Sequence, residues 1–216
     1  MRDSAASSIL RLARRYEAVL FDMDGTLLDS RAVVERVWRE WAAAHGRDFA
    51  PILAESHGRR TIDTVREFAI PGADVEEESR KVEAMEVADV EGIVAIAGAV
   101  ELISRLGNGR WAVVTSAGRE LAVRRLSAAG LPIPEVMITA ESVTEGKPEP
   151  EGYLKAARLL GVRPEECLVF EDAPAGIEAG RRAGCDVVAI TAARPHEFEA
   201  GCPEVVDYTR AEFEVG

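Results

Sequence analysis

The sequence predicts an α/β protein with a doubly wound, Rossmann-like parallel sheet and a small helical unit inserted after the first strand. Two observations lead to this prediction. Short apolar segments alternate with helical patterns through the second half of the chain, as in parallel strands joined by helices. Between residue 30 and about residue 92, no segment has the short apolar pattern of a strand. We therefore expect an N-terminal extension (1–17), a core domain (18–29 and 96–216) and a helical cap domain (30–95).

The first expected strand, residues 18–21, is an apolar run too brief for a helix. Residues 30–45 follow, with valines and tryptophans on one stripe and charged residues opposite, which predicts an amphipathic helix. His57 and Gly58 then interrupt the pattern before a second helix. The acidic segment 74–90 predicts a third, largely solvated helix whose charges need no functional explanation.

Apolar segments mark the other expected strands of the core. Each is short enough for a buried parallel strand, and helical patterns or loops separate them. A last apolar segment, EVVD, lies near the C-terminus. At the other end of the chain, the arginine-containing segment before residue 18 lacks the apolar core of a secretory signal, so we expect a terminal helix or a frayed extension there. The expected strands are residues 111–115, 136–139, 167–171 and 186–190.

Composition excludes several classes of partner. The 216 residues carry a formal charge of -12, which disfavours nucleic acids and anionic membranes because both are polyanions. No apolar run approaches the ~20 residues of a membrane span. The three cysteines form no C-x-x-C pair, and their odd number suggests no disulfide framework, so a reducing cytoplasm fits. Nothing in the pattern suggests an assembly interface, and we expect a monomer.

Candidate functional residues stand at the ends of the expected strands. Asp22 and Asp24 follow the first strand directly, and Gly25 permits a tight turn after them. Open α/β sheets bind their ligands at the carboxyl ends of the strands, so chemistry is expected there. A hydroxyl pair and two acids end later strands at the same edge, and a lysine occupies a loop of the motif GKPEP. These residues are Thr115, Ser116, Lys147, Glu171 and Asp172.

The set D-x-D-G-T, hydroxyl, G-K-P and E-D, in this order and spacing, resembles the haloacid dehalogenase-like phosphohydrolases, and the resemblance covers nearly the whole chain from Ala18. The helical insertion after the first motif is similar to the small α-helical cap of that family. Within the family, the chain most resembles the β-phosphoglucomutase-like branch. The finer resemblance is to phosphatases of glycerol phosphate and deoxyglucose phosphate, through the segments ESHGRRTIDTV, WAVVTSAGR and VFEDAPAGIEAGRRAGC.

The resemblance implies roles for the two aspartates of the first motif. Asp22 is expected to be the nucleophile that forms an aspartyl phosphate. Asp24 is expected to protonate the leaving alcohol and then to activate water. Because dehalogenases lack the second aspartate and need no metal, Asp24 argues against dehalogenation.

The resemblance also implies a phosphate site and a magnesium site. Thr115 and Ser116 would hydrogen-bond the phosphoryl oxygens, and Lys147 would neutralise their charge. Attack of a carboxylate on a phosphate dianion is opposed by about 4 kcal/mol for each pair of like charges at ~4 Å and an effective dielectric near 20. One lysine cannot balance four carboxylates, whereas Mg²⁺ prefers oxygen ligands. The expected Mg²⁺ ligands are Asp22, Asp24 through its backbone carbonyl, Glu171 and Asp172.

The substrate implied is a small phosphorylated polyol or sugar, such as glycerol phosphate or a hexose, deoxyhexose or hexitol phosphate. In the cap, His57, Arg59 and Arg60 are the candidates for contact with it, since loops often carry binding residues. A β-phosphoglucomutase-like phosphosugar mutase is an alternative, but those mutases carry a histidine where this chain has Val34. A non-catalytic phosphosugar-binding module is a second alternative, against which the complete set of motif residues argues.

Overall fold

The computed structural model describes residues 9–194 and 198–216. Within these residues, six strands form one sheet in the order β6-β5-β2-β7-β8-β9, and all neighbouring strands are parallel. The first strand of this sheet in the chain, β2, lies inside it between β5 and β7. The predicted doubly wound parallel sheet is therefore confirmed.

The two faces of the sheet pack against different helices. In β2, Val19 and Phe21 belong to a core that includes residues of α5 and α6, whereas Ala18 and Leu20 face a core with residues of α7 and α8. This alternation follows from the two-residue period of a strand. All four side chains are fully buried, which is why the segment is a continuous apolar run.

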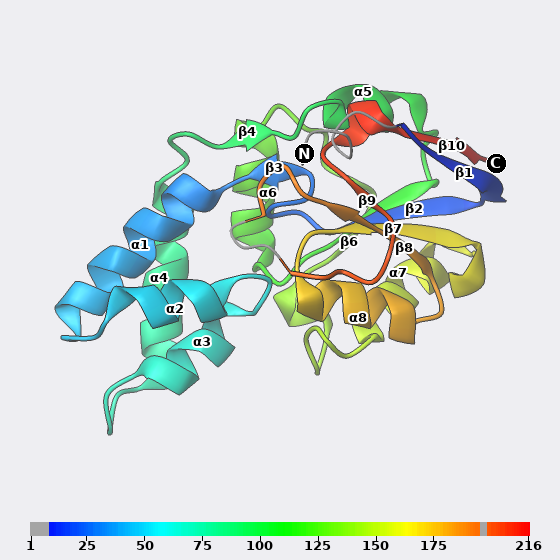
Figure 1. The fold of residues 1–216 in the computed structure, drawn as a ribbon. Helices are drawn as coiled ribbons and strands as arrows, with labels where there is room; N and C mark the ends of the chain where they lie inside the picture. The colour runs from blue at the N-terminus through cyan, green and yellow to red at the C-terminus, as the bar shows by residue number, and fades with distance from the viewer. Residues whose placement is uncertain (1–8, 195–197) are drawn as a thin grey trace.

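Four helices, α1 to α4, lie together to one side of the sheet (Figure 1). This helical unit is the cap. Most of the predicted α1 stripe is buried, at Val33, Val37, Trp38 and Trp41, whereas Val34 is only partly buried. The chain enters and leaves this helical unit through the short antiparallel pair β3 and β4, in which Leu28 pairs with Ala95. The two chain segments that connect the helical unit to the rest of the protein therefore lie side by side.

Two expectations for the N-terminal half need correction. The segment before residue 18 is neither a helix nor frayed where it is described: Leu10–Tyr16 forms β1, which pairs in parallel with β10. Alternate residues of β1, Leu10 and Leu12, pack against the main core. The pairing partner lies about 200 residues away, so local pattern alone did not reveal it. Residues 1–8 of the expected extension lie outside the described residues.

The second correction concerns α4, which is not simply a solvated helix. Ser79, Val82 and Glu86 form a buried stripe on it, so one of its acids lies in the interior. A further helix, α2, precedes the interruption at His57. No helix among the described residues is both long enough and apolar enough to cross a membrane.

The strands are β1 (Leu10–Tyr16), β2 (Ala18–Phe21), β3 (Leu28–Asp29), β4 (Val94–Ala95), β5 (Trp111–Val114), β6 (Val136–Ile138), β7 (Cys167–Glu171), β8 (Asp186–Ile190), β9 (Glu204–Val205) and β10 (Ala211–Val215). The α-helices are α1 (Arg31–Ala44), α2 (Phe49–Ser56), α3 (Thr61–Phe68), α4 (Val75–Ala88), α5 (Ala99–Arg105), α6 (Arg119–Ala128), α7 (Glu151–Leu160) and α8 (Pro174–Arg182).

Candidate active site

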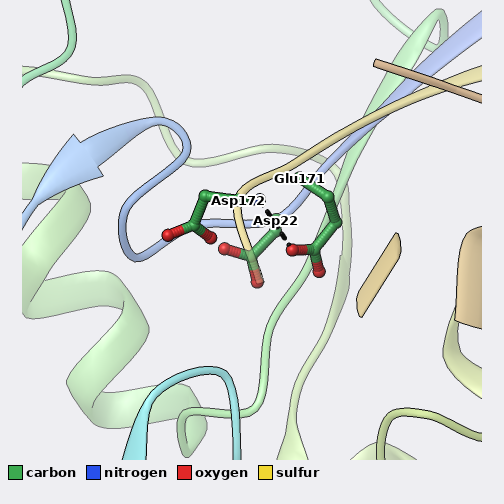
Figure 2. A group of neighbouring side chains, drawn as sticks. All are labelled: Asp22, Glu171 and Asp172. Atoms are coloured by element: carbon green, nitrogen blue, oxygen red, sulfur yellow. Dashed lines mark hydrogen bonds between the residues drawn. The ribbon is translucent and has the colours of Figure 1, made fainter. Parts of the chain in front are cut away.

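Two adjacent strands, β2 and β7, end at one place on the sheet and bring the predicted acids together. Asp22 follows β2, Glu171 is the last residue of β7, and Asp172 follows it (Figure 2). Lys147, from the loop before α7, reaches between them: its Nζ lies 2.5 Å from Asp22 Oδ1 and 2.6 Å from Glu171 Oε1. The lysine is almost fully buried, so this is an interior ion-pair cluster.

The three carboxylates form a cluster in which one oxygen of each lies within 4.8 Å of the others. Glu171 is already saturated: Oε1 accepts from Lys147 and Tyr153, and Oε2 from the backbone N–H groups of Asp172 and Ala173. Asp172 Oδ2, in contrast, is buried without a hydrogen-bond partner among the described residues. Its close polar contact among these residues is with His57 Nε2, at 2.9 Å. A buried carboxylate oxygen that accepts no hydrogen bond, beside Asp22, fits a divalent cation because it is a hard ligand with a free lone pair.

Burial and the neighbouring charges set the electrostatics of the cluster. Burial raises the pKa of Asp22 well above its usual range, while the Lys147 ammonium opposes this and the carboxylates of Glu171 and Asp172 add to it. Burial opposes protonation of Lys147, but the carboxylates of Asp22 and Glu171 raise its pKa, so it stays charged. A second cation at the cluster, beside Lys147, would favour the ionised form of Asp22.

Gly25 allows the loop after Asp24 to pass close to Asp172. Its φ is +85°, and a Cβ built there would lie 1.9 Å from Asp172 Oδ2. Thr26 fixes the other oxygen of Asp172, since its hydroxyl donates to Oδ1 at 3.2 Å. The D-x-D-G-T sequence thus provides the aspartates, the turn and a hydrogen bond that orients a third carboxylate.

Replacing Gly25 with alanine is expected to lower turnover by about 100-fold, because the new methyl group displaces Asp172. The positive φ should also cost about 1–2 kcal/mol of unfolding free energy. Gly72→Ala is the matched control: its φ is +87°, but nothing lies within 4 Å of the added Cβ. Steady-state rates and thermal unfolding of both variants check this. Equal losses of turnover in the two variants would contradict the argument.

The predicted hydroxyl pair lies at the end of β5, beside β2. Thr115 is buried, and its Oγ1 accepts the backbone N–H of Ala117 at 3.1 Å, so the hydroxyl hydrogen remains free to donate to a ligand. Ser116 instead donates to the backbone carbonyl of Gly58 at 2.9 Å. Its hydroxyl therefore bonds the core to the cap in this structure.

The three candidate cap residues occupy different environments. His57 reaches the core, with Nε2 2.9 Å from Asp172 Oδ2 but outside hydrogen-bond geometry. Although burial opposes its protonation, Asp172 raises the pKa of His57. Arg59 pairs with two cap glutamates and lines the large cavity described below. Arg60 pairs with Asp63 and donates to the backbone carbonyl of Thr144; it does not line that cavity but a smaller pocket that includes Lys147.

A cavity of about 350 Å³ lies between the cap and the strand ends. Asp22, Asp24 and Thr115 form part of its core wall, and the cap contributes both apolar and polar residues. Its volume lies within the ~300–1,000 Å³ of small-molecule sites. The cap side of the wall includes Val34, Trp38, Leu53, Ser56, His57, Arg59 and Glu86.

The polar partners of the predicted site residues were not apparent from the sequence. Ser30 donates to Asp24 Oδ1 at 2.6 Å, and Arg125 Nη1 lies 2.9 Å from the same oxygen. Arg125 also donates to Glu86 at 3.0 Å, and Tyr153 donates to Glu171 at 3.0 Å. A signal was present for two of them, because Arg125 and Glu86 each fall at helical spacing from buried residues of their own helix.

Comparison with known proteins identifies the family of the chain. A model of the haloacid dehalogenase-like hydrolases matches residues 16–184. Hexitol phosphatase A of Escherichia coli is 47% identical over 182 residues, which cover 82% of this chain and 84% of that protein. Glycerol-1-phosphate phosphohydrolase 2 of Saccharomyces cerevisiae is 37% identical over 209 residues, covering 90% and 83%.

Among solved structures, a hydrolase from Pseudomonas syringae superposes with a TM-score of 0.77 at 29% identity, covering 88% of this chain and 93% of that one. The sequence and structure comparisons therefore agree on the family and on the fold. The chain belongs to the haloacid dehalogenase-like hydrolases.

Proposed function

We propose that this hydrolase is a Mg²⁺-dependent phosphatase of small polyol or sugar phosphates that acts through an aspartyl phosphate on Asp22. The observation that carries the proposal is the contact of the buried Lys147 with Asp22 at the carboxyl edge of the sheet. A carboxylate beside a fixed ammonium and a free hydroxyl donor, Thr115, provides a nucleophile and two groups that stabilise phosphoryl charge. The named phosphatases among the relatives support the same class of substrate.

The residues present fit a divalent ion. Asp22 and Asp172 offer carboxylate oxygens, and the backbone carbonyl of Asp24 is proposed as a third ligand by analogy with the family. Glu171 is better placed to hold Lys147 and the backbone at Asp172 than to bind the ion directly, since both its oxygens are occupied. When bound, Mg²⁺ would offset the repulsion between the nucleophile and the substrate phosphate.

The first chemical step forms the aspartyl phosphate. A carboxylate oxygen of Asp22 attacks phosphorus, the bond from phosphorus to the alcohol oxygen breaks, and Asp24 gives its proton to that oxygen. Lys147 and Thr115 hold the phosphoryl oxygens during the transfer. Proton donation of this kind is typically worth ~10²–10⁴-fold in rate.

The second step returns Asp22 to its starting state. Asp24, now a carboxylate, takes a proton from water while the water oxygen attacks phosphorus, and the bond between phosphorus and Asp22 breaks. Inorganic phosphate leaves, and Asp24 is again protonated. Val34 lines the cavity. The β-phosphoglucomutase-like mutases carry a histidine at this position, and its absence here favours hydrolysis over return of the phosphoryl group to a sugar.

Phosphate release tests the proposal directly. Purified protein should release phosphate from one or more of a panel of glycerol, hexose, deoxyhexose and hexitol phosphates when Mg²⁺ is present. EDTA should abolish the activity, and excess Mg²⁺ should restore it. A protein that hydrolyses neither these esters nor 4-nitrophenyl phosphate would refute the proposal, and isomerisation of a hexose 1-phosphate without phosphate release would favour a mutase.

Arg59 is the cap arginine that lines the cavity, and we expect it to contribute to substrate binding. Arg59→Ala should raise KM for the preferred polyol or sugar phosphate about 10-fold with little change in kcat, as expected when binding common to ground and transition states is lost. Arg66→Ala is the control, because Arg66 pairs with Asp63 on the exposed surface of the same helical unit. A fall in kcat at unchanged KM would contradict this role.

A further inference from the structure

Arg125 is a buried cation that connects the core to the cap. It lies on α6 and is 3% exposed. Its guanidinium contacts two acids: Nη1 lies 2.9 Å from Asp24 Oδ1 on the core, and Nη2 donates at 3.0 Å to Glu86 Oε1 on the cap helix α4. The carboxylates of Asp24 and Glu86 raise the pKa of Arg125 although its burial opposes this, so it stays charged. A buried guanidinium needs its partners, so the two acids fix its position.

The contacts on Asp24 are asymmetric. Ser30 Oγ, at 2.6 Å, and Arg125 both bind Oδ1. Oδ2 receives no hydrogen bond from the described residues, and the Asp24 side chain remains 27% exposed at the cavity wall. With Oδ1 held from two sides, rotation of the carboxylate is restricted and Oδ2 is the oxygen left for a ligand.

We propose that Arg125 is the positioning residue for Asp24, and that its second bond, to Glu86, makes the orientation of Asp24 depend on the position of the cap. The inference rests on the proposed function, because it needs Asp24 to transfer a proton. Arg125 does not itself react: it holds Oδ1 so that Oδ2 meets the oxygen of the leaving alcohol. When the cap moves away from the core, Glu86 withdraws from Arg125, and Asp24 loses a fixed partner.

A positioning role and a purely structural role predict different results for different leaving groups. The alcohol of glycerol phosphate is a poor leaving group and must be protonated as it departs. The 4-nitrophenolate of 4-nitrophenyl phosphate departs readily without a proton. Misplacement of Asp24 therefore slows only the first ester in the phosphoryl-transfer step. General loosening of the fold slows both alike.

The experiment compares Arg125→Lys and Glu86→Gln with the wild-type protein in single turnovers, with enzyme in excess over glycerol phosphate or 4-nitrophenyl phosphate and with Mg²⁺ present. Alcohol release then reports the phosphoryl transfer to Asp22 alone. We expect Arg125→Lys to slow glycerol release about 30-fold or more, and nitrophenol release less than about 3-fold. Glu86→Gln should give the same selectivity to a smaller degree.

Arg124→Ala is the matched control, because Arg124 immediately precedes Arg125 on α6, is exposed and among the described residues donates only to the backbone carbonyl of Val87. The Arg124→Ala variant should release glycerol and nitrophenol at the wild-type rates. Equal slowing of the two esters in Arg125→Lys and Glu86→Gln would overturn the proposal, and so would unchanged rates in both. If Arg125→Lys does not fold, Glu86→Gln decides by the same criterion. Failure of the wild-type protein to cleave either ester would instead refute the proposed function.

Discussion

Asp22→Asn is expected to reduce turnover by about four to six orders of magnitude, the range seen when a catalytic nucleophile is removed. The amide has nearly the same shape as the carboxylate but cannot form the acyl phosphate. The fold should tolerate it, because burial already disfavours the charged form of Asp22 and Lys147 keeps its contact with Glu171. Phosphate release together with thermal unfolding measures both effects. Retention of activity within 10-fold of the wild type would remove Asp22 from the mechanism.

Lys147→Met is expected to impair both activity and stability. Removing one partner of a buried ion pair costs about 3–5 kcal/mol of unfolding free energy, because Asp22 and Glu171 are left without a cation. Activity should fall by about 100-fold or more through loss of the phosphoryl contact. Lys155→Met is the control: Lys155 forms a more exposed pair with Glu151 and should cost less than about 1 kcal/mol.

The stability of Lys147→Met should depend on pH in a definite direction. Lys147 lowers the pKa of Asp22 against the effect of burial, so without it the pKa in the folded state is raised further above the unfolded value. A raised folded pKa gives stability that is complete below the unfolded pKa and is lost as pH rises through the folded one. In EDTA, the variant should therefore become more stable relative to wild type as pH falls from neutral toward about 4. Denaturant unfolding at several pH values tests this, and a loss of relative stability on acidification would contradict it.

The parts of the fold that follow from local pattern were predictable. The strand at residues 18–21 is apolar on both faces because helices cover both sides of the sheet, and the acids after it stand out against that run. Since parallel strands end at one edge, the proximity of Asp22, Lys147 and Asp172 could be expected from sequence alone.

The parts that depend on distant partners were not predictable in the same way. Leu10–Tyr16 is a strand because Ala211–Val215 pairs with it. Its arginine-containing sequence, taken alone, is equally typical of a terminal helix or a frayed extension. In the sequence, Glu86 is one acid among many in an acidic segment. Its burial depends on Arg125, 39 residues later, across the interface of cap and core. The periodicity of a local sequence predicts helices and strands, whereas an ion pair between two units depends on how those units pack together.

The central claim is that the phosphoryl group passes through Asp22, and trapping it there tests this most directly. In Asp24→Asn, 4-nitrophenyl phosphate should still phosphorylate Asp22, because its leaving group needs no proton, while removal of the phosphoryl group by water is slowed. After an acid quench, borohydride reduction and peptide mapping should locate homoserine at position 22. Absence of any modification at that position, while the variant releases nitrophenol with the substrate in excess, would contradict the account.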